Sequence, residues 1–131
     1  MLVQDATRPA LRGPFDRVLV DASCSGIGSA RRRPELLWRG GPGELTALAS
    51  SQLEIACAAA DLLEPEGRLV YSVCTFPRQE TDKVCDALLE ARPFLEPAMI
   101  EGPDGPVERV RVWPHRHGSD AMFTAAFRRR L

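Results

Sequence analysis

The sequence predicts an α/β fold with an open, largely parallel sheet, and three observations predict it. Two runs rich in β-branched and aliphatic residues, at 15–21 and 66–75, are typical of buried strands. Between them, apolar residues recur at three- and four-residue steps, as expected for the helix of a βαβ unit. Short strand-like stretches near the carboxyl end favour an added strand pair. The length of 131 residues suits a single domain.

The first half of the chain predicts a strand, a loop and a helix in that order. The stretch "FDRVLVD" at 15–21 indicates a strand covered on both faces. The stretch at 25–43 is rich in glycine and proline, which predicts a loop. From Glu44 to Pro65 the apolar positions, together with Gln52, form one stripe, which predicts a helix.

The second half predicts a strand, a second helix and three short strands. The stretch "EGRLVYSVCT" at 66–75 indicates a buried strand, and a helix is expected from about Pro77, with Glu80 in its first turns, to Pro93. Short strands are expected near 94–99, 108–113 and 121–127, the last two joined as an antiparallel pair by the turn "PHRHGSD".

Two cysteines lie where the two long strands end. Asp21 and Cys24 follow the first strand, and Cys74 closes the second. If the strands are parallel neighbours, both cysteines lie on the same rim of the sheet, where ligands of open α/β sheets bind. A cysteine at such a rim can be a nucleophile, a disulfide partner, a metal ligand or a packing residue.

The residue composition and spacing exclude some of these roles for the two cysteines. The chain has four cysteines without a C-x-x-C pair, and its two histidines lie together in a late turn, so neither a zinc site nor a Cys–His hydrolase is expected. No apolar run reaches the ~18 residues of a membrane span and no signal-peptide pattern is present, which predicts a cytoplasmic protein with reduced thiols. The net charge of −1 provides no overall attraction to nucleic acid, but Arg31, Arg32 and Arg33 form a local basic run.

These segments resemble the Nol/Nop/Sun family of RNA cytosine-C5 methyltransferases. "FDRVLVDASCSGIG" resembles the family's D-A-P-C-S-G-x-G segment, and "GRLVYSVCTFPRQETDKV" resembles its G-x-L-V-Y-S-T-C-S/T segment. The tail "WPHRHGSDAMFTAAFRR" resembles the family's closing hairpin, in which Asp120 has a structural role. The resemblance implies a partial Rossmann-like, S-adenosylmethionine-dependent methyltransferase sheet with strand order 4-5-7-6, preceded by an end of strand 3.

The resemblance also implies a role for each rim residue. Cys74 is the expected nucleophile toward C6 of a cytosine, and Cys24 is expected to assist removal of the C5 proton and release of the enzyme. Asp21 is expected to hydrogen-bond the cytosine edge and to face the cofactor. The expected partner is RNA of the rRNA type, in a single-stranded or looped segment, and Arg31–Arg33 are expected to contact its phosphates.

The sequence departs from the family pattern in two kinds of feature. Ser23 replaces the usual proline, so the loop that holds Cys24 loses a rigid φ, and Val73 replaces the usual threonine, which removes a hydroxyl beside Cys74. The upstream glycine-rich cofactor turn and the ribose-binding carboxylate are missing from 1–131, where only Asp5 matches the family's aspartate near the adenine. We therefore expect the carboxyl-terminal portion of a catalytic domain, inactive alone, with strand 15–21 as an exposed apolar edge. The upstream half is expected to be lost, to be separately encoded or to be supplied by a partner chain.

Two readings from other classes compete with this one. A truncated, non-catalytic RNA-binding or interaction module accounts for the missing cofactor motif. A thiol-redox or cysteine-hydrolase domain is disfavoured by the cysteine spacing and by the position of the histidines. The remaining cysteines, Cys57 and Cys85, fall on apolar helix faces and are expected to be core residues.

Overall fold

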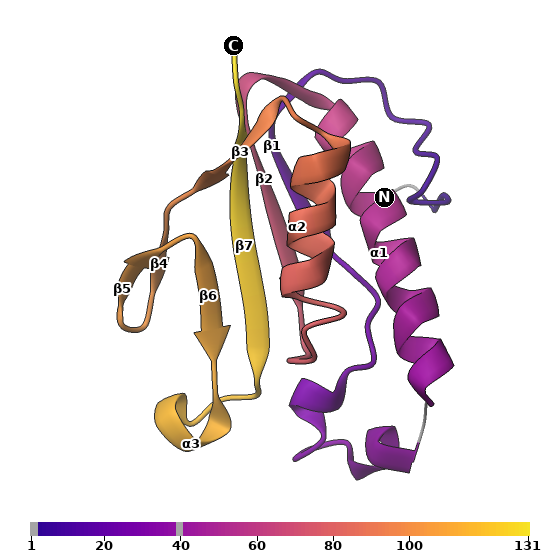
Figure 1. Ribbon diagram of the computed structural model, residues 1–131, viewed down its shortest axis with the longest axis vertical. Helices are drawn as coiled ribbons and strands as arrows, with labels where there is room; N and C mark the ends of the chain where they lie inside the picture. Colours follow the sequence, from indigo (N-terminus) through magenta and orange to yellow (C-terminus); the bar gives the residue numbers. More distant parts are fainter. Residues whose placement is uncertain (1–2, 39–40) are drawn as a thin grey trace.

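The computed structural model describes residues 3–38 and 41–131, and its centre is a mixed sheet (Figure 1). Neighbouring strands follow the order β1-β2-β7-β3, and β6 also pairs with β7. The β1–β2 pair is parallel and all other pairs are antiparallel. The order expected from the resemblance, 4-5-7-6, is confirmed as β1, β2, β7 and β3. The strands of this sheet are β1 (Phe15–Asp21), β2 (Leu63–Val73), β3 (Leu95–Ala98), β6 (Arg109–Val112) and β7 (Met122–Arg129).

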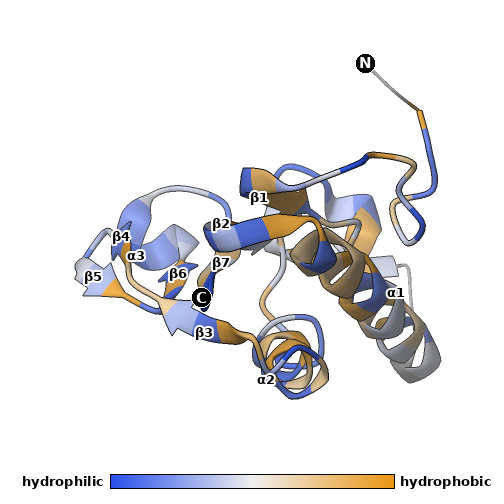
Figure 2. Cartoon of the chain, turned by 90° about the horizontal axis from the view of Figure 1, so that it is seen from above, coloured by the Kyte–Doolittle hydropathy of each residue, from blue (hydrophilic) through white to orange (hydrophobic). Residues whose placement is uncertain are grey.

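Two helices, α1 (Pro42–Asp61) and α2 (Asp82–Ala91), lie side by side against one face of the sheet (Figures 1 and 2). Alternate residues of β2 point into this layer, so Leu69, Tyr71 and Val73 are fully buried. Across the layer, α1 presents small residues such as Ala56 and Ala60, both fully buried, which allow the helix to approach the sheet closely. The apolar stripe predicted for α1 is therefore its core face.

The prediction that the first strand is covered on both faces is wrong. Val18 and Val20 pack toward the helices, whereas Leu19, on the opposite side of the strand, is 69% exposed. The physical reason is that β1 lies at the edge of the sheet and that α1 and α2 cover only one of its faces. The expected edge position of β1 is thus confirmed. Residues 3–14 contain no strand, and residues 1–2 of the expected strand-3 end lie outside the described residues.

The loops contain more structure than the sequence predicts. The loop after β1 holds two short 3-10 helices, Ile27–Ser29 and Pro34–Trp38. The second main helix begins at Asp82 rather than near Pro77, because residues 78–81 form turns.

An unpredicted hairpin follows β3. It consists of β4 (Ile100–Gly102) and β5 (Gly105–Val107), and the turn signal "GPDG" at 102–105 marks it in the sequence. The predicted β6–β7 pair is confirmed, although its connection contains a short helix, α3 (Pro114–His117). The β4–β5 hairpin and α3 lie on the side of the sheet opposite α1 and α2 (Figures 1 and 2). No helix within the described ranges is long and apolar enough to cross a membrane.

Candidate active site at the ends of two parallel strands

The structure brings the two rim cysteines into contact. The strands β1 and β2 run in parallel with Asp21 paired to Ser72, so both chains leave the sheet at the same rim. The Sγ atoms of Cys24 and Cys74, which lie 50 residues apart in the sequence, are 3.4 Å apart. Both side chains are half-buried. The predicted juxtaposition of the two thiols is therefore confirmed.

The environment of Cys24 disfavours its thiolate form. Burial, the hydrogen bond to Cys74 and the charge of that sulfur together raise the pKa of Cys24 to about 12. Cys24 therefore stays protonated at neutral pH, and in the 3.4 Å contact with Cys74 either sulfur can be the donor.

Gly28 joins the Cys24 loop to the end of β2. Its N–H group donates to the Cys74 carbonyl at 3.1 Å, and its own carbonyl accepts from the N–H group of Ala121 at 2.9 Å. A Cβ atom at this position would lie 2.1 Å from the Ala121 oxygen and 2.7 Å from the Cys74 oxygen. Only glycine allows this three-way backbone contact.

Beneath the cysteines lies a buried polar network that the sequence analysis missed. Glu80, expected as a helix-start residue, is fully buried and precedes α2. Its carboxylate accepts hydrogen bonds from the backbone N–H group of Ser25 at 2.8 Å and from Gln52 Nε2 at 3.0 Å. The side chain of Gln52 is 1% exposed. The one signal in the sequence was a glutamine placed inside the apolar stripe of a helix.

The same network replaces the rigidity that the family's proline would supply to the cysteine loop. Ser23, which stands at that position, has its carbonyl held by Gln52 Nε2 at 2.9 Å. Val73, the second departure, is fully buried in the core. Loop order at Ser23 thus has a source in side-chain hydrogen bonding.

The arginine run is engaged in ion pairs. The guanidinium of Arg32 donates to Asp120 through Nε at 2.9 Å and also through Nη2, and Arg31 lies 3.9 Å from the same carboxylate. Arg33 pairs with Glu35 at 3.1 Å. The three arginine side chains remain 58–70% exposed. Arg32 holds the pKa of Asp120 below its usual value, which fits the structural role expected for Asp120.

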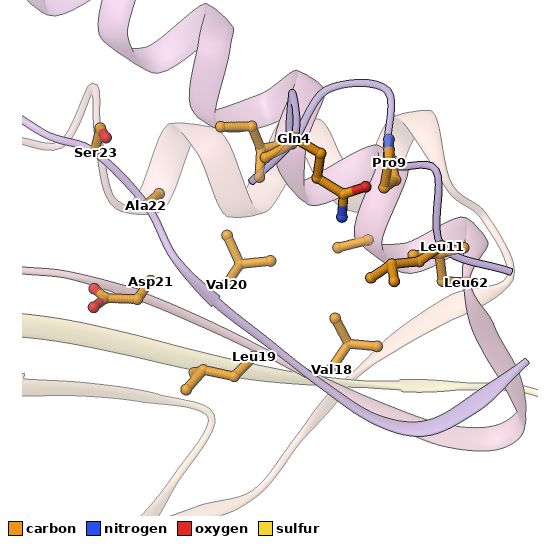
Figure 3. Close-up of a pocket in the computed structure, with 13 residues that line it drawn as sticks. Gln4, Pro9, Leu11, Val18, Leu19, Val20, Asp21, Ala22, Ser23 and Leu62 are labelled. Carbon is orange, nitrogen blue, oxygen red and sulfur yellow. The ribbon is translucent and has the colours of Figure 1, made fainter. Parts of the chain in front are cut away.

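The two aspartates expected at the cofactor line different hollows. Asp21 is exposed and lines a hollow of about 290 Å³ between β1, α1 and the amino-terminal segment (Figure 3). In that view Asp21 and Leu19 point away from Val18 and Val20. Asp5 lines a second hollow of about 500 Å³ beside α1.

The two hollows differ in how well they fit the adenosyl part of a methyl donor. The first has apolar walls with a few polar groups, as small-molecule sites have. The carboxylate of Asp5 already accepts from the N–H and hydroxyl groups of Thr7 at 2.9 and 2.7 Å, which lowers its pKa. The surroundings of Asp21 therefore fit such a group, whereas a cofactor role for Asp5 stays a prediction.

The late-turn histidines have no contact with the cysteine pair among the hydrogen bonds of the described residues. His117 Nδ1 accepts from the backbone N–H group of Trp113 at 2.9 Å, which closes the α3 turn. His115 is exposed, and its ring lies 6.2 Å from that of Trp113. Both behave as turn residues.

Comparisons with known proteins identify relatives of the whole chain. Residues 2–128 match the sequence model of the family described as 16S rRNA methyltransferase RsmB/F. The Mycobacterium tuberculosis protein Rv1407 is 45% identical over 137 residues, which cover 98% of this chain and 30% of that protein. The ribosomal RNA small subunit methyltransferase B of Thermus thermophilus is 38% identical over 129 residues, covering 96% of this chain and 32% of that enzyme.

Solved structures agree with these relatives. The crystal structure of PH0851 superposes with a TM-score of 0.80 at 32% identity, covering 86% of this chain and 26% of that one. The structure of NSun6 from Pyrococcus horikoshii with SFG has a TM-score of 0.79 at 27% identity, covering 98% of this chain and 34% of that one. The chain spans about a third of the length of the curated relatives it matches.

Proposed function

Because the chain belongs to the RsmB/F family of 16S rRNA methyltransferases, we propose that its cysteine rim is the catalytic part of an RNA cytosine-C5 methyltransferase. The observation that carries the proposal is the 3.4 Å contact between Cys24 and Cys74 at the ends of parallel strands. A nucleophile and a proton acceptor for one base must lie within reach of the same ring, and this pair does.

In the proposed reaction the Cys74 thiolate forms a bond to C6 of the target cytosine. The electron pair of the C5–C6 double bond moves to C5, which then carries the nucleophilic character. S-adenosylmethionine, when bound, supplies the methyl group as an electrophile for C5. Asp21, exposed at the same rim, would hydrogen-bond the cytosine edge and favour protonation at N3.

Release of the product requires loss of the C5 proton. We assign that proton to the Cys24 sulfur, which first loses its own thiol proton to solvent. As the Cys24 thiolate takes the C5 proton, the C5–H electron pair re-forms the C5–C6 double bond, and the C6–Sγ bond breaks to return a thiolate at Cys74. Once Cys74 is bonded to carbon it carries no negative charge, so the charge of Cys74 no longer raises the pKa of Cys24. Bond formation at Cys74 thereby makes it easier for Cys24 to lose its own proton and to become the base that the step needs.

In this proposal the methyl donor and the RNA bind to different parts of the rim. The hollow bounded by Asp21 and Ser23 would receive the adenosyl group of S-adenosylmethionine. The ligand SFG of the NSun6 structure is an analogue of that donor, which supports the choice of cofactor. The target base must leave its stack to reach Cys74, and an exposed guanidinium such as Arg31 is available to the flanking phosphates.

A non-catalytic RNA-binding or interaction module is the second candidate function. One observation favours it: the two aspartates expected at the cofactor, Asp5 and Asp21, line separate hollows. It differs from the first candidate in that it requires no bond between RNA and protein.

Covalent trapping distinguishes the two candidates. RNA containing 5-fluorocytosine is incubated with the chain and S-adenosylmethionine, because fluorine at C5 cannot leave as a proton and the adduct persists. We expect an adduct that is lost in Cys74→Ala and kept in Cys24→Ala. An adduct that survives Cys74→Ala would reject the assignment of the nucleophile, and RNA binding without any adduct would favour the module.

A further inference from the structure

The residue after each site cysteine hydrogen-bonds to one buried carboxylate. Ser25 follows Cys24 and donates to Glu80 through its N–H group at 2.8 Å and through its hydroxyl at 2.5 Å. Thr75 follows Cys74, and its hydroxyl donates to Glu80 at 3.3 Å. The hydroxyls of Ser25 and Thr75 also lie 2.8 Å apart. Glu80 therefore connects the two cysteine segments through their neighbours.

Glu80 has no exposure to water, so its hydrogen bonds within the protein determine whether its burial destabilises the fold. A buried acidic group is costly unless donors surround it. The donors that hydrogen-bond to it in the described residues are uncharged amide and hydroxyl groups. Such a site places strict demands on where those donors lie, because each lost bond leaves a buried acceptor unpaired.

Gln52 extends the same connection to the other side of Cys24. Its amide nitrogen donates to Glu80 at 3.0 Å and to the carbonyl of Ser23 at 2.9 Å. The hydroxyl of Tyr71 lies 3.1 Å from the Gln52 oxygen and 2.8 Å from the Glu80 carbonyl, which orients both. Cys24 is thus held by the residue before it and by the residue after it.

We infer that Glu80 is a positioning residue that holds the Cys24 loop against the end of β2 and so sets the separation of the two site sulfurs. Its catalytic meaning rests on the proposed function, in which Cys24 must reach a base bonded to Cys74. The geometric role does not depend on that reaction. The arrangement needs an acceptor for several donors at once, which the two oxygens of a carboxylate provide and the single oxygen of an amide provides only in part.

The ease with which Cys24 and Cys74 form a disulfide measures how the two sulfurs are held relative to each other. Glutathione disulfide oxidises the two thiols to one disulfide and is reduced to two glutathione molecules, so the equilibrium measures the effective concentration of one cysteine at the other. The Cys24–Cys74 link is quantified by peptide mass mapping in glutathione buffers. This readout is specific to the rim, because Cys57 and Cys85 lie on the two helices.

We expect Glu80→Ala to lower that effective concentration by about tenfold or more, equivalent to losing at least one well-formed hydrogen bond. Glu80→Gln should lie between this variant and the unchanged protein, because one carbonyl oxygen remains to accept. Glu90→Gln, on the exposed side of α2, is the matched charge control and should change nothing. Leu95→Ala, in the core at β3, should destabilise the fold without changing the thiol equilibrium of the folded protein.

An unchanged thiol equilibrium in folded Glu80→Ala, verified by circular dichroism, would overturn the inference. If Glu80→Ala does not fold, Glu80→Gln decides in the same way. An equal drop in the Leu95→Ala control would also overturn it, since the effect would then follow general stability. No RNA or methyl donor enters the experiment, so it stands or fails independently of the trapping experiment that tests the proposed function.

Discussion

Replacing Gly28 with alanine should uncouple the cysteine loop from the rest of the rim. The new Cβ would lie 2.1 Å from the Ala121 oxygen, against the 3.4 Å at which ordinary contact begins. The backbone must therefore separate by about 1 Å, since a close-packed interior has no void to absorb the methyl group. A shift of that size breaks the hydrogen bonds that Gly28 forms with Cys74 and Ala121, now 3.1 and 2.9 Å long.

The expected loss of stability follows from these contacts. Each broken hydrogen bond costs roughly 1 kcal/mol and the steric overlap adds about 1–3 kcal/mol, so the free energy of unfolding should fall by about 3–5 kcal/mol. That is a large share of the roughly 5–15 kcal/mol that holds a domain of this size together.

Urea unfolding of Gly28→Ala, followed by circular dichroism, measures this loss. Gly43→Ala is the control, because a Cβ at position 43 meets no atom within 4 Å and lies in a helix. It should be neutral or slightly stabilising, by up to about 1 kcal/mol. A Gly28→Ala protein whose urea midpoint equals that of the unchanged chain would refute the reasoning.

Further predictions concern single side chains. Burial and, after it, Cys74 raise the pKa of Cys24, so Cys24 should resist iodoacetamide below about pH 10 and become reactive at lower pH when Cys74→Ser removes the contribution of the neighbouring sulfur; mass spectrometry of the alkylated peptides checks this, and an unchanged pH profile would contradict it. Tyr71→Phe removes a buried donor and should lower the free energy of unfolding by about 1–3 kcal/mol in urea, whereas full stability would show that the hydroxyl is dispensable. Arg32→Gln should raise the pKa of Asp120 toward its usual value in a carbon-detected NMR titration, so the stabilisation from this pair, present at neutral pH and lost as the pH falls through that pKa, should disappear; an unmoved Asp120 pKa would refute the pairing.

Much of the fold could be predicted from local patterns, because those patterns reflect burial. The apolar runs at 15–21 and 66–75 became β1 and β2, and the stripe between them became α1. The exposure of Leu19 could not be predicted from its own segment, because it depends on which neighbouring strands and helices are present. The β4–β5 hairpin was missed although its turn residues are present in the sequence, because its three-residue strands are too short to show the alternation of apolar and polar residues that marks a strand.

The candidate site divides in the same way. Cys24 and Cys74 could be predicted to meet because topology alone brings the ends of parallel strands together. The buried network around Glu80 could not, since a carboxylate early in a predicted helix is usually exposed and favours the helix dipole. Its burial follows from the placement of α1 against the cysteine loop, which is a property of the packed chain.

The position of β7 has a consequence for synthesis of the protein on the ribosome. In the sequence this strand follows β2, β3 and β6, but in the sheet it lies between β2 on one side and β3 and β6 on the other. Until residues 122–129 have been translated, those three strands have no common partner, and the buried rings of Phe123 and Phe127 are missing from the core. Pairing of these strands therefore waits for β7 to leave the exit tunnel, and until then the nascent chain exposes apolar strands that chaperones recognise.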